Sequence, residues 1–203
     1  MLALPNGFTL GTPRGSRGWE IRMRPSGEEM SGCDVVRVHE AFVRGDLEGL
    51  RDLLGNPAEF PNSPSPSLAI GNFLEYAIYH SPLAFVRTLL ELGAEIDYEH
   101  AGFPCLIAAL STTRADKLEL IELLLRFGAD IEQRGVNDFT PLHYAAGSAD
   151  LQAVRLLLDH GADPQARTRI DDYSTALEDA EKHGLAAVVE LLRQATAARR
   201  PAG

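Results

Sequence analysis

The chain has 203 residues and a net charge of −10, and hydrophobic residues make up 45% of it. This length allows one or two globular domains, and the negative charge argues against nucleic acid as a partner, because phosphate backbones repel an acidic surface. No stretch approaches about 18 consecutive apolar residues, so the sequence predicts no membrane-spanning helix.

Residues 1–32 differ from the rest of the chain. They are rich in glycine, hold four arginines and show no apolar periodicity, so we expect a flexible segment. They lack the continuous apolar run and cleavage site of a secretory leader. Because Met23 and Met30 stand just ahead of the first predicted helix, one hypothesis is that translation starts there instead of at Met1. An intact Met1 or Leu2 terminus in the natural protein, seen by mass spectrometry, would contradict it.

A Gly-Ala-acidic tripeptide recurs along the chain and follows a leucine-rich run each time. It begins at Gly93, Gly128 and Gly161, with spacings of 35 and 33 residues. A glycine just past the last apolar position is typical of a helix end, where the backbone takes a positive φ. The preceding runs, such as residues 153–158, have apolar residues at i, i+3 and i+4. The sequence therefore predicts stacked helical units instead of one globular core.

The start of a unit is clearest at residues 140–146, Thr-Pro-Leu-His-Tyr-Ala-Ala. Thr140 can cap a helix through its hydroxyl, and proline fits the first turn because no helical N–H is needed there. Small alanines further along allow neighbouring helices to approach closely. Equivalent alanines, separated by 36, 32, 36 and 35 residues, define five units: Ala41, Ala77, Ala109, Ala145 and Ala180.

Residues 140–146, with the Val-Arg-Leu-Leu-Leu-Asp-His-Gly-Ala-Asp run at 154–163, resemble an ankyrin repeat almost position for position. Residues 135–168 match best, and four weaker copies extend the resemblance over about 33–196. It implies an all-α solenoid of about five helix-turn-helix units joined by short β-turns. The resemblance also implies that His143 is structural and forms hydrogen bonds between neighbouring turns.

The weaker copies depart from this pattern in specific ways. Unit 2 has Asn72 as its nearest capping candidate. In unit 3 the distance from Ala109 to Gly128 is 19 residues against 16 from Ala145 to Gly161, which predicts an insertion within Ser111–Lys117. The last unit loses the signature and turns polar, as a terminal unit must, since one of its faces meets water.

We expect one repeat domain at 33–198 and a tail at 199–203. The Pro-rich residues 56–67 look like an interdomain linker when taken alone. The 36-residue spacing from Ala41 to Ala77 instead makes them an ordinary loop between units. The expected units are about 33–66, 67–98, 99–134, 135–168 and 169–198.

The residue types needed for catalysis or metal binding do not fall into suitable patterns. Cys33 and Cys105 lie in different units, the six histidines include no His-x-x-x-His pair, and no phosphate-binding glycine loop is present. We therefore expect no enzyme activity, cofactor or metal, and a reducing cytoplasmic location. An enzyme or enzyme subunit remains an alternative, which a deep pocket joining either cysteine to a histidine and a carboxylate would favour.

In proteins of this family the turn tips and the exposed positions of the inner helices usually recognise the partner. Aromatic residues there are good anchors, so Tyr79, Tyr98, Phe139 and Tyr173 are expected on one concave face. The plain alternative is that these side chains pack within the frame, Phe139 between neighbouring turns. Asp138, Asp171 and Asp172 would form a negative rim. The resemblance implies these candidates: Tyr79, His80, Tyr98, Glu99, His100, Arg134, Asn137, Asp138, Phe139, Ser148, Asp171, Asp172, Tyr173 and His183.

We expect a non-catalytic, monomeric module that binds a protein partner with a basic patch. Residues 1–32 hold four arginines and three glutamates, so residues 33–203 carry a charge of −11. That acidity would attract a basic surface, although it could also serve only to solvate the outer faces. A more specific alternative is an immunity-type or antitoxin-type inhibitor of a basic toxin or enzyme. A purely structural spacer is a third.

Overall fold

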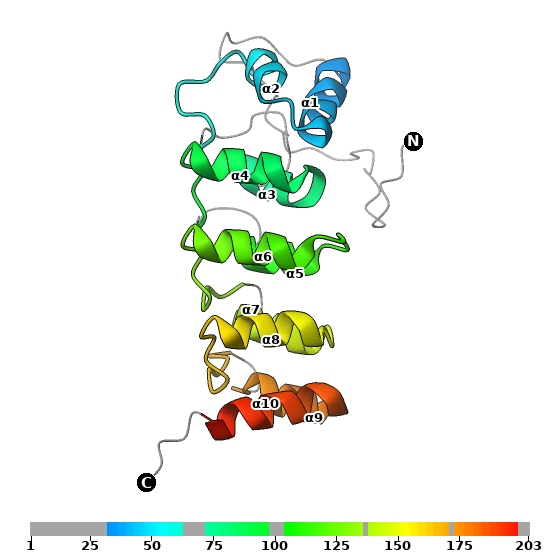
Figure 1. Cartoon of the computed structure of the whole chain (residues 1–203), viewed down its shortest axis with the longest axis vertical. Coiled ribbons are helices and arrows are strands. Elements are labelled where there is room, and N and C mark those ends of the chain that lie inside the picture. Colours follow the sequence, from blue (N-terminus) through cyan, green and yellow to red (C-terminus); the bar gives the residue numbers. More distant parts are fainter. Residues whose placement is uncertain (1–31, 63–71, 98–103, 136–137, 171–172, 199–203) are drawn as a thin grey trace, which may run out of the picture.

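The computed structural model describes residues 32–62, 72–97, 104–135, 138–170 and 173–198. Within these residues, helices form five pairs that follow one another along the longest axis of the molecule (Figure 1). We call each pair a unit, numbered 1 to 5 in chain order. The fold is an all-α repeat solenoid, as the sequence predicts. The helices are α1 Gly32–Arg44, α2 Leu47–Leu53, α3 Phe73–His80, α4 Leu83–Glu91, α5 Cys105–Ser111, α6 Lys117–Arg126, α7 Pro141–Gly147, α8 Leu151–Asp159, α9 Ala176–Lys182 and α10 Ala186–Ala198.

Each unit packs its two helices against each other, and the first helix of a unit also contacts the first helix of the next. These inner helices are α1, α3, α5, α7 and α9, and the outer helices are α2, α4, α6, α8 and α10. The alanines at the equivalent positions, from Ala41 to Ala180, are buried throughout. No helix in the described part of the chain is both long and apolar enough to cross a membrane.

Glycines end the outer helices of units 2, 3 and 4, as expected. Gly93, Gly128 and Gly161 have φ values of +87°, +94° and +100°. A fourth glycine stop, which the tripeptide pattern does not reveal, follows α2: Gly55 has φ +75°, and the Asn56 N–H donates to the Arg51 carbonyl at 2.7 Å. Because α2 has seven residues and α4 has nine, this glycine falls outside the register of the others.

Helix caps explain where the inner helices begin. The Asn72 side chain accepts a hydrogen bond from the Glu75 N–H at 2.8 Å, which confirms it as the cap of unit 2. Thr140 caps α7, with Pro141 in the first turn. Thr175 and Glu178 form a capping box at α9, in which each side chain binds the other residue's backbone N–H.

The expected insertion in unit 3 lies between its two helices. Residues 112–116 separate α5 from α6, whereas two or three residues separate the helices of the other units. The remaining extra residue lies in α6, which has ten residues against nine in α8. The insertion therefore lengthens the inner-to-outer turn and leaves the stacking register intact.

Candidate partner-binding surface

Hydrogen bonds from a backbone N–H to a side chain link unit 1 to unit 2, unit 2 to unit 3 and unit 3 to unit 4 at the tripeptides. The third residue of each tripeptide donates its N–H to a side chain of the preceding unit. This hydrogen bond uses only the backbone of the donating residue and not its side chain. The donor and acceptor pairs are Glu95 and Asn62 (2.8 Å), Asp130 and Asp97 (3.2 Å), and Asp163 and Glu132 (2.7 Å). Asn62, Asp97 and Glu132 recur at intervals of 35 residues, a signal that was open to sequence analysis and that the sequence analysis missed.

Arg114, which lies in the insertion of unit 3, forms hydrogen bonds with unit 2. Arg114 donates from Nη1 to the carbonyls of Ile78 (3.0 Å) and Ser81 (2.7 Å), where α3 ends. Its Nε and Nη2 both bind the Asp116 carboxylate at 2.7 Å. This hydrogen bond from Arg114 is also the main cause of the lowered pKa of Asp116. The side chain thus satisfies helix-end carbonyls that have no partner within α3.

The turn tips of units 4 and 5 are joined by an ion-pair network centred on Asp138. This buried carboxylate accepts hydrogen bonds from Arg134 Nη1 (2.8 Å) and Arg169 Nη2 (2.7 Å). The hydrogen bond from Arg169 lowers the pKa of Asp138 to about 2. Arg134 also donates to the Arg167 carbonyl at 2.9 Å. The expectation of Asp138 as part of a free negative rim is therefore wrong, because two arginines neutralise it.

His143 is buried beside this network, and the half-buried ring of Phe139 lies against the His143 ring. Their rings stack with centroids 5.7 Å apart and an interplanar angle of 1°. His143 Nε2 lies 3.2 Å from the Ser174 carbonyl, which can only accept, so Nε2 carries the proton and Nδ1 accepts from the Thr140 hydroxyl at 2.8 Å. Burial lowers the pKa of His143. His143 has the structural role that the resemblance implies, and Phe139 stays half-buried against the ring of His143 in its own unit.

The inner helices of units 2 to 4 expose no charged side chain. α5 and α7 contain no acidic or basic residue besides His143, and the only carboxylate of α3, Glu75, is buried. Tyr79 donates from its hydroxyl to Ser111 Oγ at 3.0 Å, since Ser111 donates its own proton to the Ala108 carbonyl. Ser148 is exposed at the C-cap of α7. This face therefore presents phenol and hydroxyl groups instead of carboxylates.

Three further candidates lie at the two ends of this inner face. His80 is half-buried, with its ring 5.3 Å from that of His39, and burial lowers the pKa of His80. His183 is exposed at the end of α9, where its Nδ1 donates to the Asp179 carbonyl at 2.8 Å. Tyr173, at the tip of unit 5, is 61% exposed. The other candidates lie outside the described residues: Tyr98, Glu99, His100, Asn137, Asp171 and Asp172.

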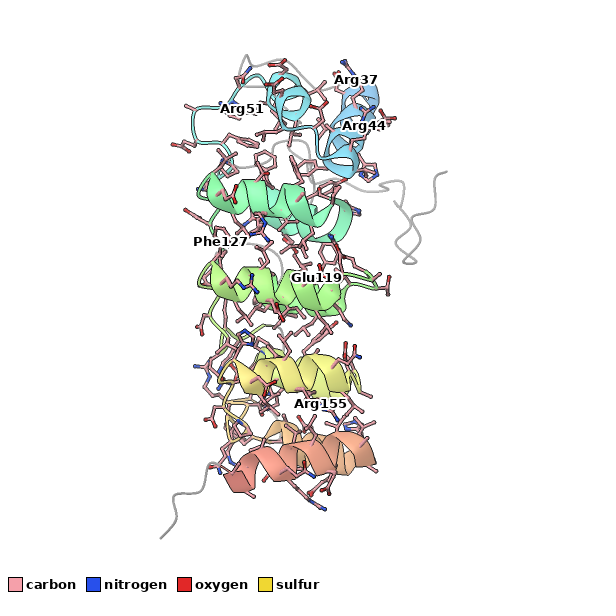
Figure 2. The ribbon with its side chains drawn as sticks, viewed as in Figure 1. Arg37, Arg44, Arg51, Glu119, Phe127 and Arg155 are labelled. Carbon is pink, nitrogen blue, oxygen red and sulfur yellow. The ribbon has the colours of Figure 1, made fainter. Side chains whose placement is uncertain are left out.

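Cys105 does not lie in a site suited to nucleophilic chemistry. Its side chain is fully buried in α5, and burial raises the pKa of the thiol to about 12. A hollow of about 420 Å³ lies between α1 and α2, at the N-terminal end of the stack, where Figure 2 labels Arg37 and Arg44. Its lining contains charged side chains but neither cysteine nor histidine. Among the described residues, no group of three or more acidic, histidine or cysteine side chains is placed to hold a metal ion.

Comparison with known proteins agrees with this architecture. The family model for ankyrin repeats in three copies matches residues 105–199, which begin at the first residue of α5. The chain is also 40% identical over 176 residues to the ankyrin repeat and KH domain-containing protein mask-1 of Caenorhabditis elegans. That alignment covers 86% of this chain and 6% of the relative. The chain therefore belongs to the ankyrin-repeat family.

Other relatives show the same pattern of partial overlap. Ankyrin repeat and SOCS box protein 11 of Homo sapiens is 31% identical over 121 residues, which are 59% of this chain and 35% of the relative. Delta-latroinsectotoxin-Lt1a of Latrodectus tredecimguttatus is 38% identical over 81 residues, or 40% of this chain and 7% of the toxin. The chain thus spans only a minor part of the length of each of these relatives.

Proposed function

We propose that this chain is a non-catalytic module that binds a protein partner through the inner helices of units 2 to 4 and the turn tip of unit 5. Ankyrin repeats generally mediate protein–protein interaction. The observation that carries the proposal is the inner face itself. It presents aromatic and hydroxyl groups, such as Tyr79 and Ser148, over a frame whose helix ends and turn tips are already hydrogen-bonded.

The side chains on this surface and the net charge of the chain indicate which contacts such a partner would make. Tyr79 and Tyr173 can bury large rings while losing little rotamer freedom, which suits them as anchors. Ser148 can exchange hydrogen bonds without the cost of desolvating a charge. Because the chain carries a net charge of −10, a partner with a basic surface would associate faster, and its binding would weaken with added salt.

A pair of arginine substitutions on neighbouring helices tests the location. Ser148→Arg places a long cation at the end of α7 on the inner face. Gln152→Arg places the same group on α8, where Gln152 is also exposed. Each variant, after its fold is checked by circular dichroism, is used to capture proteins from the native host at low and moderate salt. We expect Ser148→Arg to lose a partner that the unchanged chain and Gln152→Arg both retain.

Equal recovery of every partner by both variants would contradict the proposed surface. Loss of the same partner from both variants would also count against it, because the added charge and not the position would then be responsible.

A further inference from the structure

Two large apolar side chains are exposed at the same position of neighbouring outer helices. Leu92 is 44% exposed and Phe127 is 39% exposed, and each is the C-cap residue immediately before a glycine stop. Figure 2 shows Phe127 at the end of α6, on the side where the chain passes from one unit to the next. Because α4 and α6 are the outer helices of consecutive units in the stack, Leu92 and Phe127 occupy equivalent positions in neighbouring units (Figure 1).

The frame does not require an apolar side chain at this position. In unit 4 it is His160, which is exposed and donates from Nδ1 to the Leu156 carbonyl at 2.9 Å, so a polar residue ends the helix equally well. In unit 1 the equivalent Leu54 is buried. Among units 1 to 4, exposed apolar residues at this position therefore occur only in units 2 and 3, and helix packing does not account for them.

Three carboxylates follow the two apolar residues closely in the chain. Glu95 and Asp130 each lie three residues beyond them, and the frame uses the backbone N–H of both residues. Asp97 lies on the same edge; burial raises its pKa, and the charge of Asp130 adds to this effect. None of these three carboxylates forms an ion pair with another described residue. The nearby cation Arg126 already pairs with Glu122 on its own helix at 3.2 Å.

We infer that this outer edge of units 2 and 3, formed by Leu92, Phe127, Glu95, Asp97 and Asp130, binds a basic segment of a protein partner that carries apolar side chains. The inference rests on the proposed function and deepens it, because it assigns the basic character of the partner to the outer edge and leaves the inner face to uncharged contacts. Leucine-sized side chains of the segment cover Leu92 and Phe127, while its lysines or arginines face the carboxylates.

The charge of the edge selects among possible occupants. A second copy of this chain would bring the same carboxylates against themselves, and like charges in contact are repelled. Nucleic acid and anionic membranes are disfavoured for the same reason. A protein segment with lysine or arginine on one face and apolar residues on the other is complementary to both components of the edge.

The probe for this edge is a short fluorescent helical peptide with leucines along one face and lysines along the other. Its affinity is measured by fluorescence anisotropy. We expect the double variant Leu92→Ser/Phe127→Ser to weaken binding about tenfold, since two apolar contacts are lost. Val36→Ser/Val43→Ser is the matched control, because those α1 residues are 53% and 46% exposed, and it should bind as the unchanged chain does.

A second pair of variants tests the charges. Glu95→Gln/Asp130→Asn keeps the shape of both side chains, and the Asn amide oxygen can still accept the bond that Asp130 receives from the Glu132 N–H. We expect binding several-fold weaker than that of the unchanged chain, with a smaller salt dependence. A peptide with glutamate in place of lysine should not bind, and a peptide with serine in place of leucine should bind about tenfold more weakly.

Equal peptide affinity for the unchanged chain and Leu92→Ser/Phe127→Ser would overturn the inference, as would equal loss in the Val36→Ser/Val43→Ser control. Ser148→Arg separates this inference from the proposed function, because it should leave peptide binding unchanged. If Ser148→Arg abolishes peptide binding, the peptide occupies the inner face. The outer-edge site is then wrong while the proposed function stands.

Discussion

A cluster of aromatic rings distinguishes the junction between units 1 and 2, whereas a network of charged and neutral hydrogen bonds distinguishes the junction between units 4 and 5. In the first, the Phe42 ring lies 4.8 Å from Tyr76 and 5.8 Å from Phe85. In the second, Asp138 and His143 bond to named atoms of the next unit. Hydrophobic burial does not depend on direction, so unit 1 can pack without any repeat signature. A hydrogen bond needs particular atoms at fixed positions, which explains why the signature is strongest in unit 4.

The largest expected effect comes from removing the centre of the aromatic junction. Phe42→Ala deletes a fully buried ring that also contacts Phe73, and such truncations typically cost about 3–5 kcal/mol of unfolding free energy. We expect urea denaturation to show this loss. Hydrogen exchange should show protection lost in α1 and α2 and kept in α9 and α10.

Phe127→Ala is the matched control for this prediction. Because Phe127 is exposed, its truncation should change stability by no more than about 0.5 kcal/mol. Uniform loss of protection along the whole stack in Phe42→Ala would contradict the local character of the aromatic junction.

The contact between units 2 and 3 combines both kinds of force and should give the next largest effect. Arg114→Ala removes two hydrogen bonds to α3 carbonyls and leaves Asp116 without its cation, at a cost of about 2 kcal/mol. Arg155→Ala, at an exposed position of α8, is the control and should be nearly neutral. Thermal denaturation measures both, and a neutral Arg114→Ala would show that water replaces the side chain without loss.

Two glycines at equivalent inner-to-outer turns compare the two ends of the stack directly. Gly45 and Gly184 have φ values of +69° and +70°, so Gly→Ala costs about 1 kcal/mol at either from backbone strain alone. A Cβ at Gly45 would also lie 3.3 Å from the Phe85 Cβ, while Gly184 has open space around it. We therefore expect Gly45→Ala to destabilise the chain more than Gly184→Ala in chemical denaturation. Equal costs would mean that the aromatic junction shifts to admit a methyl group.

The smallest expected effect is a difference in how the stability of the two junctions changes at acidic pH. Because the pKa of Asp138 is lowered to about 2 in the folded chain, its contribution to stability is complete above the unfolded value of 3.8 and is lost as the pH falls toward 2. Burial lowers the pKa values of His80, at the junction of units 1 and 2, and of His143, at the junction of units 4 and 5. Both junctions therefore lose stability as the pH falls below 6.5. Only the loss between about pH 4 and pH 2, which Asp138 causes, distinguishes the two junctions.

Acid titration followed by NMR of α9 amides measures this difference. Asp138→Asn should remove the transition between about pH 4 and pH 2 and leave the loss below 6.5 unchanged. A transition of the same size in Asp138→Asn would assign it to other carboxylates.

The features that the sequence alone predicted are those that depend on residues close together in the chain. Gly93, Gly128 and Gly161 end helices because only glycine takes a positive φ without strain, and Asn72 caps α3 through a residue three positions away. The insertion before α6 followed from spacing. The fourth stop at Gly55 was missed because α2 is shorter than the helices that set the period.

Only the tertiary structure decided which side chains meet between units. Spacing placed Asp138 at a turn tip but did not show that it pairs with Arg169, or that His143 bonds to the Ser174 carbonyl. The sequence likewise gave the net charge but not where the charges lie. In the structure, the inner face of units 2 to 4 is uncharged and the outer edge is acidic. Local conformation depends on neighbouring residues, whereas these contacts join residues of different units, and their partners are set only when the units stack.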